Sequence, residues 1–182
     1  MGAICVKPGS FEAVRADPRG FCEWAVDTAR VRGASLAVVT HIAAVTVLDV
    51  DFASPGDPAL AGYPAESARV SVFANGVVVA VPLGRPERTW KHRYPFQPSA
   101  ACSGEWELAV GALCLWYPGD PPHLRWDWSN GLDDFVRILQ RHLWMEEYCR
   151  RNGRPWPVED APHGTPCFGA HPILTSALKR PA

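Results

Sequence analysis

Six cysteines are the side chains of this sequence best suited to nucleophilic chemistry. No two of them have the Cys-x-x-Cys spacing, and the first ten residues lack the apolar core of a secretion signal, so we expect reduced thiols and a cytoplasmic protein. Cys114 belongs to a short apolar run at residues 108–117, which a Pro-Gly turn follows. This position predicts a sulfur exposed at the end of a strand, open to a large acyl donor.

A cysteine at such a place can pass an acyl group between thiols. Its thiolate attacks a thioester, and the new thioester stays reactive toward amines. Asp120 and His123, which follow Cys114 in the turn, are candidates to orient or deprotonate an incoming amine. The alternatives are that Cys114 is a small core residue and that Asp120 belongs to a solvated turn. Cys102, which has small polar neighbours, is the competing thiol.

A second set of potential ligands lies near the C-terminus. His163, Cys167 and His171 are spaced by three residues, and Cys149 or Cys5 could complete four zinc ligands. The prolines in and beside this stretch disfavour the helix that would place the ligands on one face. We therefore expect no metal and no cofactor, with a small zinc protein as an alternative class.

The elements that must position these groups begin with a helix. Asp17 and Pro18 suit its first two positions, and Gly33 is placed to end it. Asn75-Gly76, between two apolar runs, predicts a tight hairpin. The expected strands are residues 36–40, 44–52, 69–73 and 77–82.

The second half of the chain contains the clearest helix. Ser129 or Asn130 can cap it, and Gly153 can stop it. Residues 154–182 hold six prolines and are expected to wrap the domain as an irregular tail. Helix, antiparallel meander, loop and helix predict an α+β fold, with residues 1–182 as one domain whose core spans about 11–153.

The composition limits the partners. The chain has 182 residues, 47% of them hydrophobic, and a formal net charge of −1. It has no run of Lys or Arg, so we expect neither nucleic acid nor an anionic membrane as partner. The longest apolar stretch, residues 34–50, is short for a membrane span and contains polar side chains, so we expect it to lie in the core.

The order of several short motifs resembles a ubiquitin-conjugating enzyme. After the hairpin come Tyr94-Pro-Phe-Gln-Pro98, the Cys-Leu pair at Cys114, then Trp128-Ser129-Asn130 and an amphipathic helix. The resemblance spans roughly residues 69–145. It implies a ubiquitin-conjugating-like fold in which Cys114 is the nucleophile of an acyl transferase, carrying a protein C-terminus as a thioester.

Further motifs are similar to a bacterial branch of that family. Residues 142–148, Trp156-Pro157 and Pro162-His163-Gly164 resemble conjugating-enzyme-like proteins of CBASS antiphage defence operons. This resemblance implies a protein substrate, the C-terminus of a cGAS-like nucleotidyltransferase. The chain lacks a phosphate-binding glycine loop, so a separate activating enzyme would supply the cargo.

The sequence also departs from the family pattern. Members usually have His-Pro-Asn shortly before the cysteine, and residues 99–113 contain neither His nor Asn. Thioester formation is therefore expected more firmly than aminolysis, for which Asp120 and His123 are the candidates. The alternative is a catalytically inert conjugating-enzyme-like module that forms a stable complex with the nucleotidyltransferase.

Overall fold

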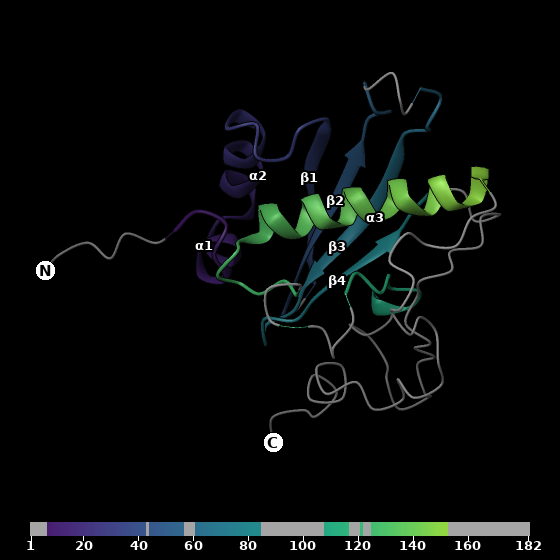
Figure 1. Cartoon of the computed structure of the whole chain (residues 1–182). Coiled ribbons are helices and arrows are strands. Elements are labelled where there is room, and N and C mark those ends of the chain that lie inside the picture. The colour runs from purple at the N-terminus through teal and green to yellow at the C-terminus, as the bar shows by residue number, and fades with distance from the viewer. Residues whose placement is uncertain are drawn as a thin grey trace, which may run out of the picture.

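The structure is a computed structural model of the whole chain, and it describes residues 7–42, 44–56, 61–84, 108–116, 121 and 125–152. Within these ranges the chain forms two short helices, four strands and one long helix, in that order. The long helix crosses in front of the sheet, and the two short helices lie beside its first strand (Figure 1). An α+β architecture with an antiparallel sheet is thus confirmed.

The two short helices are α1 (Phe11–Ala16) and α2 (Pro18–Asp27). The side chain of Ser10 accepts a hydrogen bond from the Ala13 N–H, and Asp17 does the same for Gly20, so each helix has a side-chain cap. Helix α2 ends before the predicted Gly33. The Thr28 N–H and hydroxyl both donate to the Trp24 carbonyl, and Ala29 adopts a positive φ of 52°, which turns the chain away.

Four strands form one antiparallel meander in the order β1-β2-β3-β4. They are β1 (Ala34–Ile42), β2 (Val45–Phe52), β3 (Glu66–Val72) and β4 (Val78–Pro82). The register places Val50 between Leu36 and Ala68, and it shifts between Val38 and Thr40 of β1.

The β3–β4 connection confirms the predicted hairpin. The Gly76 N–H donates to the Phe73 carbonyl at 2.9 Å, and the Phe73 N–H donates to the Val77 carbonyl at 2.9 Å. Gly76 has a φ of +83°, which favours glycine, and the Asn75 side chain accepts from the Val77 N–H.

Helix α3 (Leu132–Asn152) covers one face of the sheet (Figure 1). The main core forms there, because alternate residues of each strand meet the apolar side of the helix. Its large, fully buried side chains include Leu48, Val50, Val70, Phe135, Leu139 and Leu143. A smaller cluster on the opposite face joins Val45, Val47, Phe73 and Val79 to Ala109 and Ala112.

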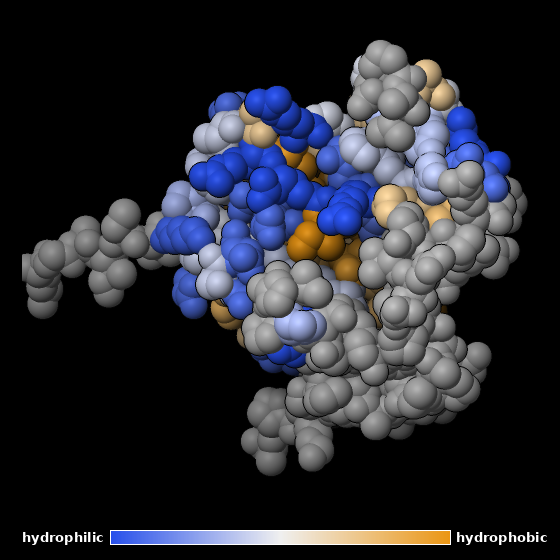
Figure 2. Space-filling model, viewed as in Figure 1, coloured by the Kyte–Doolittle hydropathy of each residue, from blue (hydrophilic) through white to orange (hydrophobic). Residues whose placement is uncertain are grey.

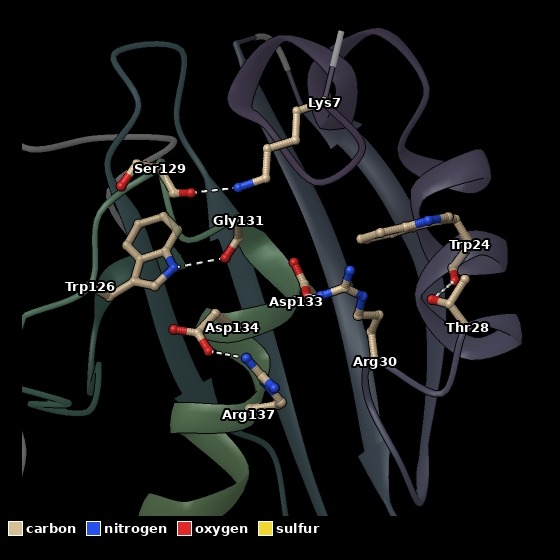
Figure 3. Close-up of polar contacts among 10 residues, drawn as sticks. All are labelled: Lys7, Trp24, Thr28, Arg30, Trp126, Ser129, Gly131, Asp133, Asp134 and Arg137. Carbon is tan, nitrogen blue, oxygen red and sulfur yellow. Dashed lines mark hydrogen bonds and ion pairs between the residues drawn. The ribbon is translucent and has the colours of Figure 1, made fainter.

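The N-terminal segment is tied to the start of α3. The Lys7 ammonium donates to the Ser129 carbonyl at 2.6 Å, and the Arg30 guanidinium lies 3.9 Å from the buried Asp133 carboxylate (Figure 3). The Leu132 N–H also donates to the Gly9 carbonyl at 2.9 Å. These contacts fix α1 and α2 against the N-terminal end of α3.

The predicted cap of α3 is wrong. Asn130 accepts from the Asp127 N–H and belongs to a turn, and Gly131, at a φ of +90°, is the residue that precedes the helix. Hydrogen bonds from the side chain and then the backbone of Ser129 lower the pKa of Asp127 below its usual value.

No helix in the described parts of the chain combines the length and apolarity needed to cross a bilayer.

Candidate active site

Cys114 lies in a segment, residues 108–116, that runs along the outer edge of β4. The Leu113 N–H donates to the Ala80 carbonyl at 2.8 Å, so a bridge of one residue is found where the apolar run at residues 108–117 predicts that Cys114 ends a strand. Residues 108–111 form a tight turn instead, in which the Ala112 N–H reaches the Ala109 carbonyl and Gly111 has a φ of +76°. The glycine turn explains why the apolar run does not extend as a strand.

This segment passes from one face of the sheet to the other. Ala109 and Ala112 are 1% exposed and pack in the smaller cluster, whereas Leu113, 2% exposed, packs in the main core. Alternating side chains therefore bury the segment on both faces of β4. The backbone of Cys114 is held directly after the point where the chain crosses the sheet edge.

Cys114 itself is 7% exposed, and its thiol donates to the Trp116 carbonyl at 3.4 Å. The prediction of a sulfur exposed to a large donor is wrong for this structure. The sequence misleads here because Leu113 on one side and Trp116 on the other both pack inward, which draws the intervening residues to the core. A hydrogen bond from a thiol to a carbonyl is weak, so it orients the sulfur at little cost.

An aromatic cluster packs this segment against α3. The ring centroids of Trp116 and Phe135, a residue of α3, lie 5.9 Å apart in an edge-to-face arrangement. Those of Trp126 and Phe135 lie 5.2 Å apart. Two indole N–H groups are also anchored: Trp126 Nε1 donates to the Gly131 carbonyl at 2.8 Å (Figure 3), and Trp128 Nε1 to the Gly76 carbonyl at 2.7 Å. Trp126 is buried in the main core and Trp128 is partly buried against it, and their hydrogen bonds link the hairpin to the turn before α3.

The other predicted site residues lie outside the described residues. They are Asp120, His123, Cys102 and Tyr94 to Pro98, together with His163, Cys167 and His171. Across the ranges that the structure describes, no three His, Cys, Asp or Glu side chains are grouped to hold a metal ion. Of the two competing thiols, Cys114 and Cys102, the structure describes Cys114 alone.

Two other described cysteines differ from Cys114 in setting. Cys22 lies on α2, and burial, with a smaller effect of the Glu23 carboxylate, raises the pKa of its thiol to about 11. It stays protonated at neutral pH and is a poor nucleophile. Cys149 lies in the last turns of α3 and is 3% exposed. Neither lies at the β4 edge, so both serve as reference thiols for Cys114.

Comparison with known proteins adds no relative. No protein-family model, no curated protein and no solved structure matches this chain.

Proposed function

We propose that this chain is a ubiquitin-conjugating-like acyl transferase that accepts a protein C-terminus as a thioester on Cys114. The observation that carries the proposal is the position of Cys114, directly after Leu113, whose N–H bridges to the β4 edge of a four-stranded meander. A helix that covers the sheet follows it. This is the element order that the motif resemblance implies.

The proposed chemistry is a transfer between thiols, in which the Cys114 sulfur, 7% exposed in this structure, must become accessible to the donor. The Cys114 thiolate attacks the carbonyl carbon of an incoming thioester, a new carbon–sulfur bond forms, and the bond to the leaving thiolate breaks. The exchange needs no metal or redox partner, because one thioester replaces another and the leaving thiolate takes up a proton. The protein has only to hold the backbone of Cys114 in place, and the Leu113–Ala80 bridge does so.

The cargo and the second step form part of the same proposal. The bacterial defence-operon motifs favour the C-terminus of a cGAS-like nucleotidyltransferase as the acyl donor, delivered by a separate activating enzyme in the cytoplasm of a bacterium. Asp120 and His123 are the candidates to assist transfer to an amine, since the usual Asn before the cysteine is missing.

A second candidate function is supported by the burial of Cys114. At 7% exposure, with its thiol bonded to the Trp116 carbonyl, the residue meets the description of a structural cysteine. In that case the chain is a conjugating-enzyme-like module that binds the nucleotidyltransferase without forming a covalent bond.

A synthetic donor distinguishes the two functions without an activating enzyme. A glycine-ended peptide thioester of mercaptoethanesulfonate is mixed with the protein, and the intact mass is measured under non-reducing conditions. The transferase predicts one acyl adduct on Cys114, removed by dithiothreitol and absent from Cys114→Ala. The binding module predicts an adduct level on Cys114 no higher than on the buried Cys149.

The competing thiols need their own control. Cys102→Ser and Cys22→Ala variants should form the adduct at the wild-type rate, because neither residue is the proposed nucleophile. An adduct that survives in Cys114→Ala but disappears in Cys102→Ser would reject the assignment of Cys114.

A further inference from the structure

A hollow lies at the opposite edge of the sheet from Cys114, between α2 and β1. Its volume is about 880 Å³, within the range of ligand-binding clefts. In Figure 2 the part of the surface where α1 and α2 lie is mostly hydrophilic, with a few hydrophobic residues between the hydrophilic ones. We call this hollow the β1 groove.

Strand β1 presents its backbone to the β1 groove. Four consecutive residues, Ala34 to Ala37, line the groove. Side chains of consecutive strand residues point to opposite faces, so a cavity lined by all four meets the strand along its edge. β1 is the first strand in the sheet order, and no other strand from the described residues pairs with its outer side.

The hydrogen-bond pattern identifies which groups of that edge are unpaired within the sheet. The Ala53 N–H donates to the Gly33 carbonyl at 2.7 Å, which makes this pair a hydrogen-bonded one. Pairs alternate along an antiparallel ladder, so Ala34 and Leu36 direct their N–H and C=O groups away from β2. These groups can receive a new strand, up to the register shift after Val38.

The other wall of the β1 groove is acidic. Asp17, Glu23 and Asp27 line it, against one cation, Arg19. Arg19 lies 3.8 Å from Glu23, but both side chains are more than two thirds exposed, so the pair is weak. Asp27 is at the C-terminal end of α2, where a carboxylate opposes the helix dipole. The position of Asp27 is therefore not explained by the stability of the helix.

We propose that the β1 groove binds an extended peptide strand of a partner protein that carries Lys or Arg at alternate positions. The strand adds to β1 through the outward backbone groups of Ala34 and Leu36, and its cations meet Glu23 and Asp27. A second copy of this chain fits less well, because edge-to-edge pairing would bring two sets of the same carboxylates together. The proposal is independent of the function of Cys114.

The test uses a fluorescent peptide, acetyl-Lys-Val-Lys-Val-Lys-Val-Lys-amide, and its Glu-for-Lys counterpart. Fluorescence anisotropy should show saturable binding of the Lys peptide alone. Asp27→Lys should weaken that binding by about fivefold, the scale of an exposed ion pair that is reversed. Glu12→Lys, which makes the same charge change on α1 outside the groove, should leave it unchanged. Equal binding of both peptides, or equal effects of both variants, would overturn the charge assignment.

Strand addition is tested on the peptide rather than on the protein. Alternate N–H groups of a strand point to the same side. Methylating the amide nitrogens of the Val residues, or those of the Lys residues, should therefore abolish binding in one case and preserve it within about twofold in the other. Binding that survives both methylations would reject pairing with β1. So would sedimentation analysis showing a dimer that the Lys peptide does not dissociate.

Discussion

The two edges of the sheet differ in what lies beside them. At the β4 edge, residues 108–116 bridge to Ala80 and bury apolar side chains on both faces of the sheet. At the β1 edge, a groove of about 880 Å³ separates the strand from α2, and carboxylates line it. Unpaired edges invite association, and chains normally cover or charge them. This chain covers the edge that carries Cys114 and places carboxylates beside the other, so the proposed nucleophile and the proposed docking edge lie at opposite edges of the sheet.

The largest difference between the two edges should appear in stability. Leu113→Ala should reduce the free energy of unfolding by about 2–5 kcal/mol, because a buried leucine is lost from the main core. Leu36→Ala, on the β1 edge, should cost roughly 1 kcal/mol, since only part of that side chain is removed from water. Urea unfolding of both variants measures the contrast, and equal losses would show that the β4 edge is no better packed.

A smaller effect concerns the hydrogen bond from the Trp128 indole to the Gly76 carbonyl. Trp128→Phe should cost about 1 kcal/mol in urea unfolding, because the Gly76 carbonyl loses its hydrogen bond. Trp144→Phe is the matched control. Its Nε1 is buried and has no hydrogen-bond partner among the described residues, so this change should be neutral or slightly stabilising. A greater cost for Trp144→Phe than for Trp128→Phe would contradict the anchoring of the hairpin to α3.

Reversing a charge at the β1 edge should increase the free energy of unfolding, whereas the substitutions at the β4 edge should reduce it. Asp27→Lys should raise the free energy of unfolding by about 0.3–1 kcal/mol, because a cation suits the C-terminal end of α2. Glu12→Lys places a cation in the first turn of α1 and should reduce the free energy of unfolding by a few tenths of a kcal/mol. If Asp27→Lys were destabilising, the carboxylate would have a structural role and the acidic wall would need another explanation.

A further effect is the pH dependence of Cys22, which lines the β1 groove. Its pKa is raised to about 11 in the folded protein. The unfolded thiol ionises at lower pH, so the stabilisation is complete below about pH 8.5 and declines as the pH rises toward 11. Unfolding measured from pH 8 to 11 should show this loss in the wild type and less of it in Cys22→Ala. If the free energy of unfolding declined equally in the wild type and in Cys22→Ala, other titrating groups would be the cause.

Local signals allowed much of the fold to be predicted from the sequence. Asp17-Pro18 and Asn75-Gly76 each encode a specific backbone geometry, and the helix and hairpin at those places are confirmed. Boundaries set by tertiary contacts were missed. Helix α2 ends at Asp27 because of bonds back to Trp24, and α3 follows Gly131 rather than an Asn cap.

The candidate site was less predictable than the fold. Residues 108–117 have the composition of a strand, but the glycine turn at Gly111 and the burial on two faces of the sheet depend on β4 and α3. No local pattern indicates that Leu113 and Trp116 draw Cys114 inward. The β1 groove was also not predicted, since it is formed by residues of α2 and β1 that become neighbours only in the folded chain.

The central claim, that the residue held at the closed β4 edge is a nucleophile, is tested most directly by the acyl adduct of Cys114. Intact-mass measurement with the glycine-ended peptide thioester should give one adduct per chain, located on Cys114 by peptide mapping and reversed by dithiothreitol. Cys114→Ala should give none, while Cys22→Ala and Cys102→Ser should react like the wild type. A folded wild-type protein that forms no adduct on Cys114 would contradict the account.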